Sequence, residues 1–128
     1  MQQFEFHPSL PSTTASAAWI EVEPSIHELT LNSSPSSSRR TLLQRWAPNT
    51  SNVCQDFVHE YIEEIYIVEG TLSCEDDSAR GVQGGKWEKG AYAYRKPGMR
   101  HGPFRSGEEG CLMFITCTPV GECTWTED

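Results

Sequence analysis

Hydrophobic residues along the chain gather in short runs that turn signals separate. The clearest run is 63–75, EEIYIVEGTLSCE, in which four apolar residues at 65–68 are followed by Glu69 and Gly70. Similar runs occur at 40–46, 55–61, 86–98 and 110–120. No stretch shows the period of about 3.6 residues that marks a long amphipathic helix. Short strands divided by frequent turns predict an all-β protein, either a sandwich or a barrel.

The first 38 residues differ in composition from the rest of the chain. Two stretches rich in Ser, Thr and Pro, PSLPSTTASAA and NSSPSSS, are typical of loops. Between them, residues 19–22 and 28–31 are short candidate strands. We therefore predict a loosely structured N-terminal segment, 1–38, that packs on or extends from the main domain rather than building it. The barrel domain is expected over 39–128.

Composition narrows the range of partners and locations. The 128 residues suit one domain, and the net charge of -8 with a pI of about 4.9 argues against nucleic acid or an anionic membrane as partner. The five cysteines include no CxxC pair, so we expect reduced thiols. The first basic residue is Arg39, and no apolar stretch long enough for a signal peptide or a membrane span follows Met1. A soluble, cytoplasmic protein is expected.

Ionisable residues concentrate in two places beside the apolar runs. Residues 59–64, HEYIEE, directly precede the strongest strand, and His101 lies in PGMRHGPF, residues 97–104. The Pro-Gly turn before His101 and the Gly-Pro after it restrict its backbone, which fixes the direction of the imidazole. Two imidazoles and one carboxylate on a common face would make a three-ligand metal site with open positions. Fe(II), Zn(II), Mn(II) and Ni(II) all accept such ligands.

The spacing of His59 and Glu63 imposes a geometric condition on this site. On a straight strand the two residues would lie about 13 Å apart, whereas each ligand of one ion lies only about 2 Å from it. The chain must therefore reverse at 60–62. Given that reversal, strand alternation places Glu63 on the same face as Ile65 and turns Glu64 to the other face. Glu63 is the better metal ligand, and Glu64 is the better candidate for a supporting role.

The two clusters resemble the paired motifs of the cupin superfamily. The first motif is HxH, three or four residues, Glu, six residues and Gly, and it is matched in spacing by His59, Glu63 and Gly70. The second is Gly, five residues and PxGxxH, and it is matched by Gly90, Gly98 and His101, with Pro97 shifted by one position. The resemblance covers about residues 40–118. It looks most like the branch of the anti-sigma-factor zinc cupins, with acetylacetone-cleaving dioxygenases as more distant relatives.

This resemblance implies a double-stranded β-helix barrel, often a homodimer, with a metal ion inside. It also implies a hairpin between the strands that carry HxH and Glu. Two positions depart from the motifs, since Phe57 replaces the first histidine and Arg105 replaces a final asparagine. The remaining ligands are His59, Glu63 and His101, a triad suited to non-haem Fe(II). The same loss could instead mark a cupin that has abandoned metal.

The leading functional hypothesis is a metal-dependent enzyme acting on a small oxygenated organic molecule, with a dioxygenase favoured. A redox-silent metal would instead support an isomerase, cyclase or decarboxylase, and a regulatory cupin without catalysis is a third possibility. Glu64 and Tyr92 are candidate proton-transfer residues. Arg100 and Arg105 flank His101 and are favoured over Arg45 to hold an anionic oxygen of the substrate, with Arg95 as a further candidate.

Overall fold

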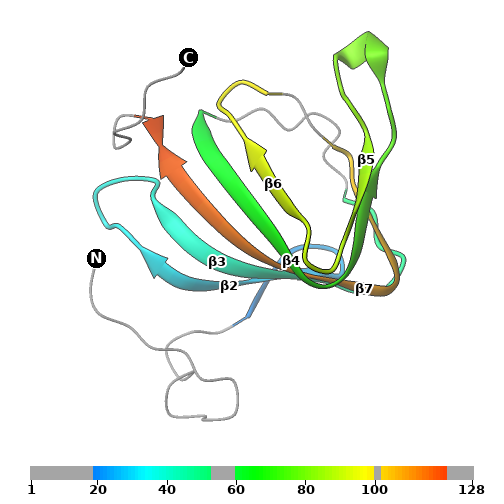
Figure 1. The fold of residues 1–128 in the computed structure, drawn as a ribbon. Coiled ribbons are helices and arrows are strands. Elements are labelled where there is room, and N and C mark those ends of the chain that lie inside the picture. Colours follow the sequence, from blue (N-terminus) through cyan, green and yellow to red (C-terminus); the bar gives the residue numbers. More distant parts are fainter. Residues whose placement is uncertain (1–18, 53–59, 100–101, 121–128) are drawn as a thin grey trace.

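The computed structural model describes residues 19–52, 60–99 and 102–120, which form antiparallel strands and one short 3-10 turn (Figure 1). The elements are β1 (Ile20–Glu23), β2 (Ile26–Ser33), β3 (Arg40–Trp46), β4 (Tyr61–Cys74), η1 (Ser78–Arg80), β5 (Gly85–Glu88), β6 (Tyr92–Arg95) and β7 (Arg105–Pro119). The all-β class predicted from the sequence is confirmed. Within the described residues, no helix is long and apolar enough to cross a membrane.

All seven strands belong to one strongly curved sheet. Its order is β1-β2-β3-β7-β4-β5, and β6 pairs with β4 as well. The long strands β4 and β7 form the centre, and the sheet bends so that one face becomes a concave interior (Figure 1). That interior buries the apolar core, which includes Ile26, Leu42, Ile67, Leu72, Met113 and Ile115. Burying each such side chain contributes roughly 1.5–3 kcal/mol.

The strands agree with the apolar runs in most places, with one division that the sequence did not predict. β3 has the predicted bounds, and β4 covers the strongest run. The run at 86–98 is divided between two strands. β5 and β6 lie one after the other along β4, and each pairs with a different part of it. Gly90 interrupts them with a φ of +90° and donates its N–H to the Ile67 carbonyl. The strand expected at 55–61 lies almost wholly outside the described residues.

Residues 20–33 correct the expectation for the N-terminal segment. β2 pairs with β3 over most of its length, and its residues Ile26 and Leu29 are fully buried. This part of the segment therefore builds the sheet and does not merely lie over it. The short strands predicted at 19–22 and 28–31 correspond to β1 and to part of β2. The Ser- and Pro-rich flanks led to the wrong expectation that these strands lie outside the main sheet. The division at residue 38 stays a prediction, and residues 1–18 are outside the described part.

The start of β4 corrects the predicted chain reversal. Tyr61 and Ile62 already belong to β4, where they pair with Pro119 and Thr118 of β7. The reversal expected at 60–62 is therefore wrong for these two residues, and only Glu60 is bent. The predicted alternation is confirmed, because Ile65 and Ile67 are buried while Tyr66 between them is exposed. Backbone pairing with β7 extends the strand further than its sequence indicates.

Candidate functional site

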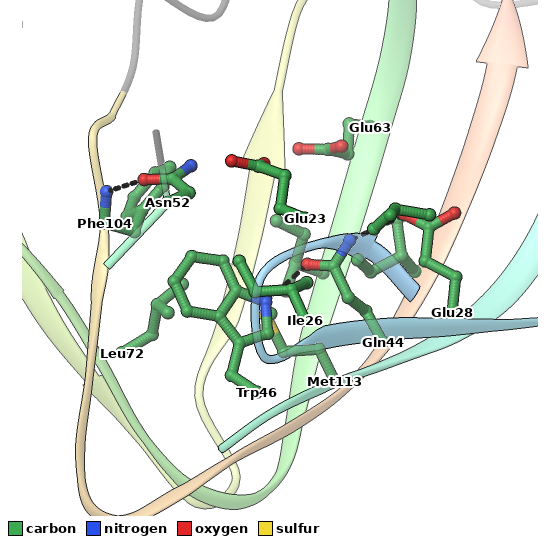
Figure 2. Close-up of a pocket in the computed structure, with 13 residues that line it drawn as sticks. Glu23, Ile26, Glu28, Gln44, Trp46, Asn52, Glu63, Leu72, Phe104 and Met113 are labelled. Atoms are coloured by element: carbon green, nitrogen blue, oxygen red, sulfur yellow. Dashed lines mark hydrogen bonds between the residues drawn. The ribbon is translucent and has the colours of Figure 1, made fainter. Parts of the chain in front are cut away.

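A cavity of about 220 Å³ opens on the concave face of the sheet (Figure 2). Its walls are largely apolar and include Ile26, Trp46, Leu72, Phe104 and Met113. Five polar side chains also line it: Glu23, Glu28, Gln44, Asn52 and Glu63. Small-molecule sites typically combine apolar walls with a few converging polar groups. This cavity is therefore the candidate functional site within the described part of the chain.

Glu63 stands at the centre of a row of polar residues that crosses four strands. Its register partners are Cys117 on β7 and Arg95 on β6, and Cys117 is in turn opposite Arg40 on β3. Residues directly opposite one another on antiparallel strands project to the same face. The row thus has one guanidinium group at each end, with the Cys117 thiol and the Glu63 carboxylate between them. Figure 2 shows the Glu63 and Glu23 carboxylates directed into the same part of the cavity.

Glu28 is held in place by a chain of hydrogen bonds. The Trp46 indole N–H donates to Gln44 Oε1 at 2.7 Å, and Gln44 Nε2 donates to Glu28 Oε2 at 2.7 Å (Figure 2). Arg40 donates to the other carboxylate oxygen of Glu28 at 3.1 Å. Burial by itself would lower the pKa of Arg40, but the charge of Glu28 and their hydrogen bond raise it above its usual value. Glu28 is thus fixed in orientation and paired in charge.

Asn52 ties together two segments that are distant in sequence. Its buried side-chain oxygen accepts the Phe104 N–H at 2.8 Å, and its own backbone N–H donates to the Phe104 carbonyl at 3.2 Å (Figure 2). A buried amide oxygen bonded in this way is costly to remove. Asn52 precedes the segment that contains His59, and Phe104 follows His101 by three residues. Asn52, just before the segment with His59, and Phe104, shortly after His101, therefore both lie in the cavity wall.

Arg95 is the most deeply buried charged group in the described structure. It is 3% exposed, and its guanidinium carbon lies 5.1 Å from the ring centre of Trp87 and 5.0 Å from that of Phe104. Burial lowers the pKa of Arg95, and the charge of Glu63 opposes that change. Its Nε has no hydrogen-bond partner among the described residues. Two aromatic rings and the field of Glu63 thus compensate for the loss of water around the guanidinium.

The sequence profile of the ChrR cupin-like domain matches residues 9–121. The chain belongs to the ChrR cupin-like family. The predicted cupin resemblance is therefore confirmed, and the double-stranded β-helix fold with it. No curated protein matches the chain.

Solved structures support the fold of this ChrR-like cupin. An RmlC-like cupin from Shewanella frigidimarina is 13% identical, with 95% of each chain covered and a TM-score of 0.69. KdgF from a Halomonas species is 12% identical, with 92% of this chain and 94% of that chain covered and a TM-score of 0.61. An acetylacetone dioxygenase from Acinetobacter johnsonii is 15% identical, with 92% and 76% covered and a TM-score of 0.62. At such identities these likenesses show the fold alone.

The predicted site residues of this ChrR-like cupin that the structure describes do not all lie together. Glu63 lines the cavity, as its predicted orientation requires. His59, His101 and Arg100 lie outside the described residues, so the metal triad stays a prediction. Among the described residues, no group of three His, Cys, Asp or Glu side chains could hold a metal ion.

Glu64 and Tyr92 are brought together, but on the outer face of the sheet. The Tyr92 hydroxyl donates to Glu64 Oε1 at 2.7 Å, and both side chains line a different hollow from that of Glu63. Successive residues of a strand project to opposite faces. The structure therefore separates these two proton-transfer candidates from the cavity of the ChrR-like cupin.

The positions of the described arginines do not follow the preference for Arg105 as a residue that holds the substrate. Arg105 is exposed and donates to Ser51 Oγ at 3.2 Å, away from the cavity. Arg45 lies with its guanidinium carbon 5.1 Å from the ring centre of Trp19. Arg95, which the sequence analysis did not favour, is the register partner of Glu63. Proximity to His101 in sequence was a poor guide, because strand pairing brings Arg95 to the site.

Four polar cavity residues of the ChrR-like cupin were not predicted as site residues: Glu23, Glu28, Gln44 and Asn52. Ile26 and Glu28 share one face of β2, and this two-residue alternation was a usable signal in a segment that its composition caused us to discount. Asn52 gave no signal, because its role depends on Phe104, which is 52 residues away.

Arg95→Ala is expected to lower the free energy of unfolding by about 3–5 kcal/mol, because it removes a buried side chain and the cation that is the register partner of Glu63. Arg95→Met retains most of the volume between Trp87 and Phe104 and should cost less. Adding Glu63→Gln to Arg95→Met should recover stability, since it removes the remaining charge. Urea denaturation of the four proteins measures these differences. Equal losses in the Met and Ala variants would show that packing is not the cause.

Proposed function

We propose that this ChrR-like cupin is a metal-dependent enzyme that acts on a small oxygenated organic molecule, with a dioxygenase reaction favoured. The observation that carries the proposal is the Glu63 carboxylate, which projects into a mostly apolar cavity beside the Asn52–Phe104 contact. A cavity of about 220 Å³ is equivalent to roughly seven water volumes. It suits a small substrate.

His59 and His101 would complete the metal site together with Glu63. The fit rests on the donor type and on the position of Glu63, which faces the cavity to which both histidine-bearing segments lead. One carboxylate and two imidazoles suit Fe(II) or Zn(II) and also accept Mn(II) or Ni(II). When bound, the ion would supply Lewis-acid chemistry and, as Fe(II), a position for oxygen.

The other residues of the chain orient and protect the substrate. The opposite charges of Arg95 and Glu63 attract each other across the strand pair, and the hydrogen bonds to Glu28 fix a second carboxylate in the wall. Tyr61 shares the face of Glu63, and burial raises the pKa of its phenol to about 12. The phenol therefore stays protonated at neutral pH, close behind the residues that line the cavity. The apolar walls exclude water from the substrate.

The deciding experiment combines metal analysis with oxygen uptake. The purified protein is loaded with Fe(II) or Zn(II), and turnover of β-diketones and polyphenols is followed alongside dissolved oxygen. For a dioxygenase we expect oxygen consumption that is stoichiometric with substrate loss and that requires Fe(II). Turnover without oxygen consumption would exclude the dioxygenase. The homodimer expected from the cupin resemblance is measured on the same samples by sedimentation.

A second candidate is non-redox chemistry on a similar substrate, such as isomerisation, cyclisation or decarboxylation. It is favoured by Glu23, a second carboxylate directed into the part of the cavity that Glu63 faces (Figure 2). A carboxylate near the reacting group can accept and return a proton. Anaerobic turnover in the Zn(II)-loaded protein, lost in Glu23→Gln, would select this candidate over the dioxygenase.

A further inference from the structure

The outer face of the sheet carries a second hollow, separate from the Glu63 cavity. This aromatic groove measures about 200 Å³ and is lined by Glu64, Ile65, Tyr66, Tyr92, Phe114 and Thr116. Tyr66 on β4 is the register partner of both Tyr92 on β6 and Phe114 on β7. Neighbouring strands lie about 4.8 Å apart. The three aromatic side chains therefore form one row across three strands.

The rings of the aromatic groove are accessible. Tyr66 is 46% exposed, Tyr92 is 56% exposed and Phe114 is 37% exposed. Large aromatic side chains usually bury most of their area in a core or an interface. The face of an aromatic ring carries partial negative charge and attracts cations. The row thus offers three cation-attracting groups within one small hollow.

Glu64 adds a full negative charge to the same groove. Its two carboxylate oxygens accept hydrogen bonds from the Tyr92 hydroxyl at 2.7 Å and the Thr116 hydroxyl at 3.1 Å. Both donors are neutral, and none of the six lining residues is basic. The hydrogen bond to Glu64 raises the pKa of Tyr92 to about 12, so this phenol stays neutral and keeps donating. These bonds orient the carboxylate without neutralising it.

We propose that the aromatic groove binds a small alkylated ammonium ion. Aromatic rings grouped around a carboxylate are the surroundings that such a cation prefers, because its apolar methyl groups contact the rings while its charge faces both rings and carboxylate. The net charge of -8 also raises the concentration of cations near the surface. The proposal goes beyond the proposed function and is independent of it, because the groups that would contact the cation, Glu64 and the three rings, do not line the Glu63 cavity, and Ile65 alone borders both hollows.

Other occupants fit the groove less well. A neutral ligand gains nothing from the Glu64 charge, and an anion is repelled by it. A second copy of the chain related by a two-fold axis through the groove would bring the two Glu64 carboxylates toward each other. An alkylated ammonium ion uses both the rings and the charge.

The test is an NMR titration of the isotope-labelled full chain with choline chloride. The control ligand is 3,3-dimethylbutan-1-ol, the neutral carbon analogue of choline, and sodium chloride controls for ionic strength. We expect chemical-shift changes at Tyr66, Tyr92 and Phe114 that saturate with a dissociation constant on the order of 1–10 mM. The neutral analogue should bind at least about tenfold more weakly.

Three variants separate charge from ring contacts. Glu64→Gln and Tyr66→Leu should each weaken choline binding about tenfold or more. Glu88 is an exposed carboxylate on β5, and the control substitution Glu88→Gln should leave choline binding unchanged. A dispersed amide spectrum verifies that each variant is folded. Equal binding of choline and its neutral analogue, or unchanged affinity in folded Glu64→Gln, would overturn the proposal. So would a dimer that covers the groove and excludes choline.

Discussion

Glu63→Gln is expected to lower the affinity of the protein for its divalent metal by more than about 100-fold, since even outer partners of metal ligands contribute about 10–100-fold. Glutamine has nearly the same shape but no charge, so it is a poor ligand and leaves the cavity volume unchanged. Metal content after dialysis, measured by mass spectrometry, reports the effect directly. Activity toward whichever substrate is identified should fall in parallel.

Glu69→Gln is the matched control, because Glu69 is an exposed carboxylate on the same strand β4 and does not line the cavity. It should retain metal at the level of the unmodified protein. Circular dichroism of both variants distinguishes ligand loss from unfolding. Full metal retention in folded Glu63→Gln would contradict the assignment of Glu63 as a ligand, and the metal-dependent function would then lose its main support.

Gly70→Ala is expected to lower the free energy of unfolding by about 2–5 kcal/mol, from the left-handed backbone and from overpacking together. Gly70 has a φ of +78°, and a Cβ there would overlap the carbonyl oxygen of Gly110 on β7. The register of β4 against β7 shifts on either side of this position. The two strands approach closely at the bend, and only glycine permits that approach. Thermal and urea unfolding measure the loss.

Gly81→Ala separates backbone strain from steric overlap. Gly81 has a similar φ of +72°, but no atom lies near the position that its Cβ would take. Its substitution should cost only the backbone term, about 1–2 kcal/mol. If Gly70→Ala proves no more damaging than Gly81→Ala, the close approach of β4 and β7 is not what requires glycine at residue 70.

The spacing between Glu63 and Gly70 acquires a physical meaning from these contacts. Glu63 projects into the cavity near one end of β4, while Gly70 lies where the same strand bends against β7. A shift of one residue between them would turn the carboxylate to the outer face, because strand side chains alternate. The motif that suggested a cupin thus records both a ligand candidate and the bend of the strand that carries it.

The sequence by itself determined the local features of this protein. Alternation along one strand assigned Glu63 to the inner face and Glu64 to the outer face, and apolar runs located β3, β4 and most of β7. These features depend on residues that are close together in the chain. The reversal predicted at 60–62 failed because pairing of Tyr61 and Ile62 with β7 extends β4, and no local signal reports a partner strand.

Only the tertiary structure decided which residues meet. Glu28 joins Gln44 from β3, Asn52 binds Phe104, and Arg95 lies beside Glu63, although none of these pairs is close in sequence. The candidate strand at 28–31 was predicted, but its pairing with β3, which brings Glu28 to the cavity, was not. Contacts of this kind follow from the register between antiparallel strands, and register is set by how whole faces pack against the core. That is a property of the complete sheet, and no single stretch of sequence contains it.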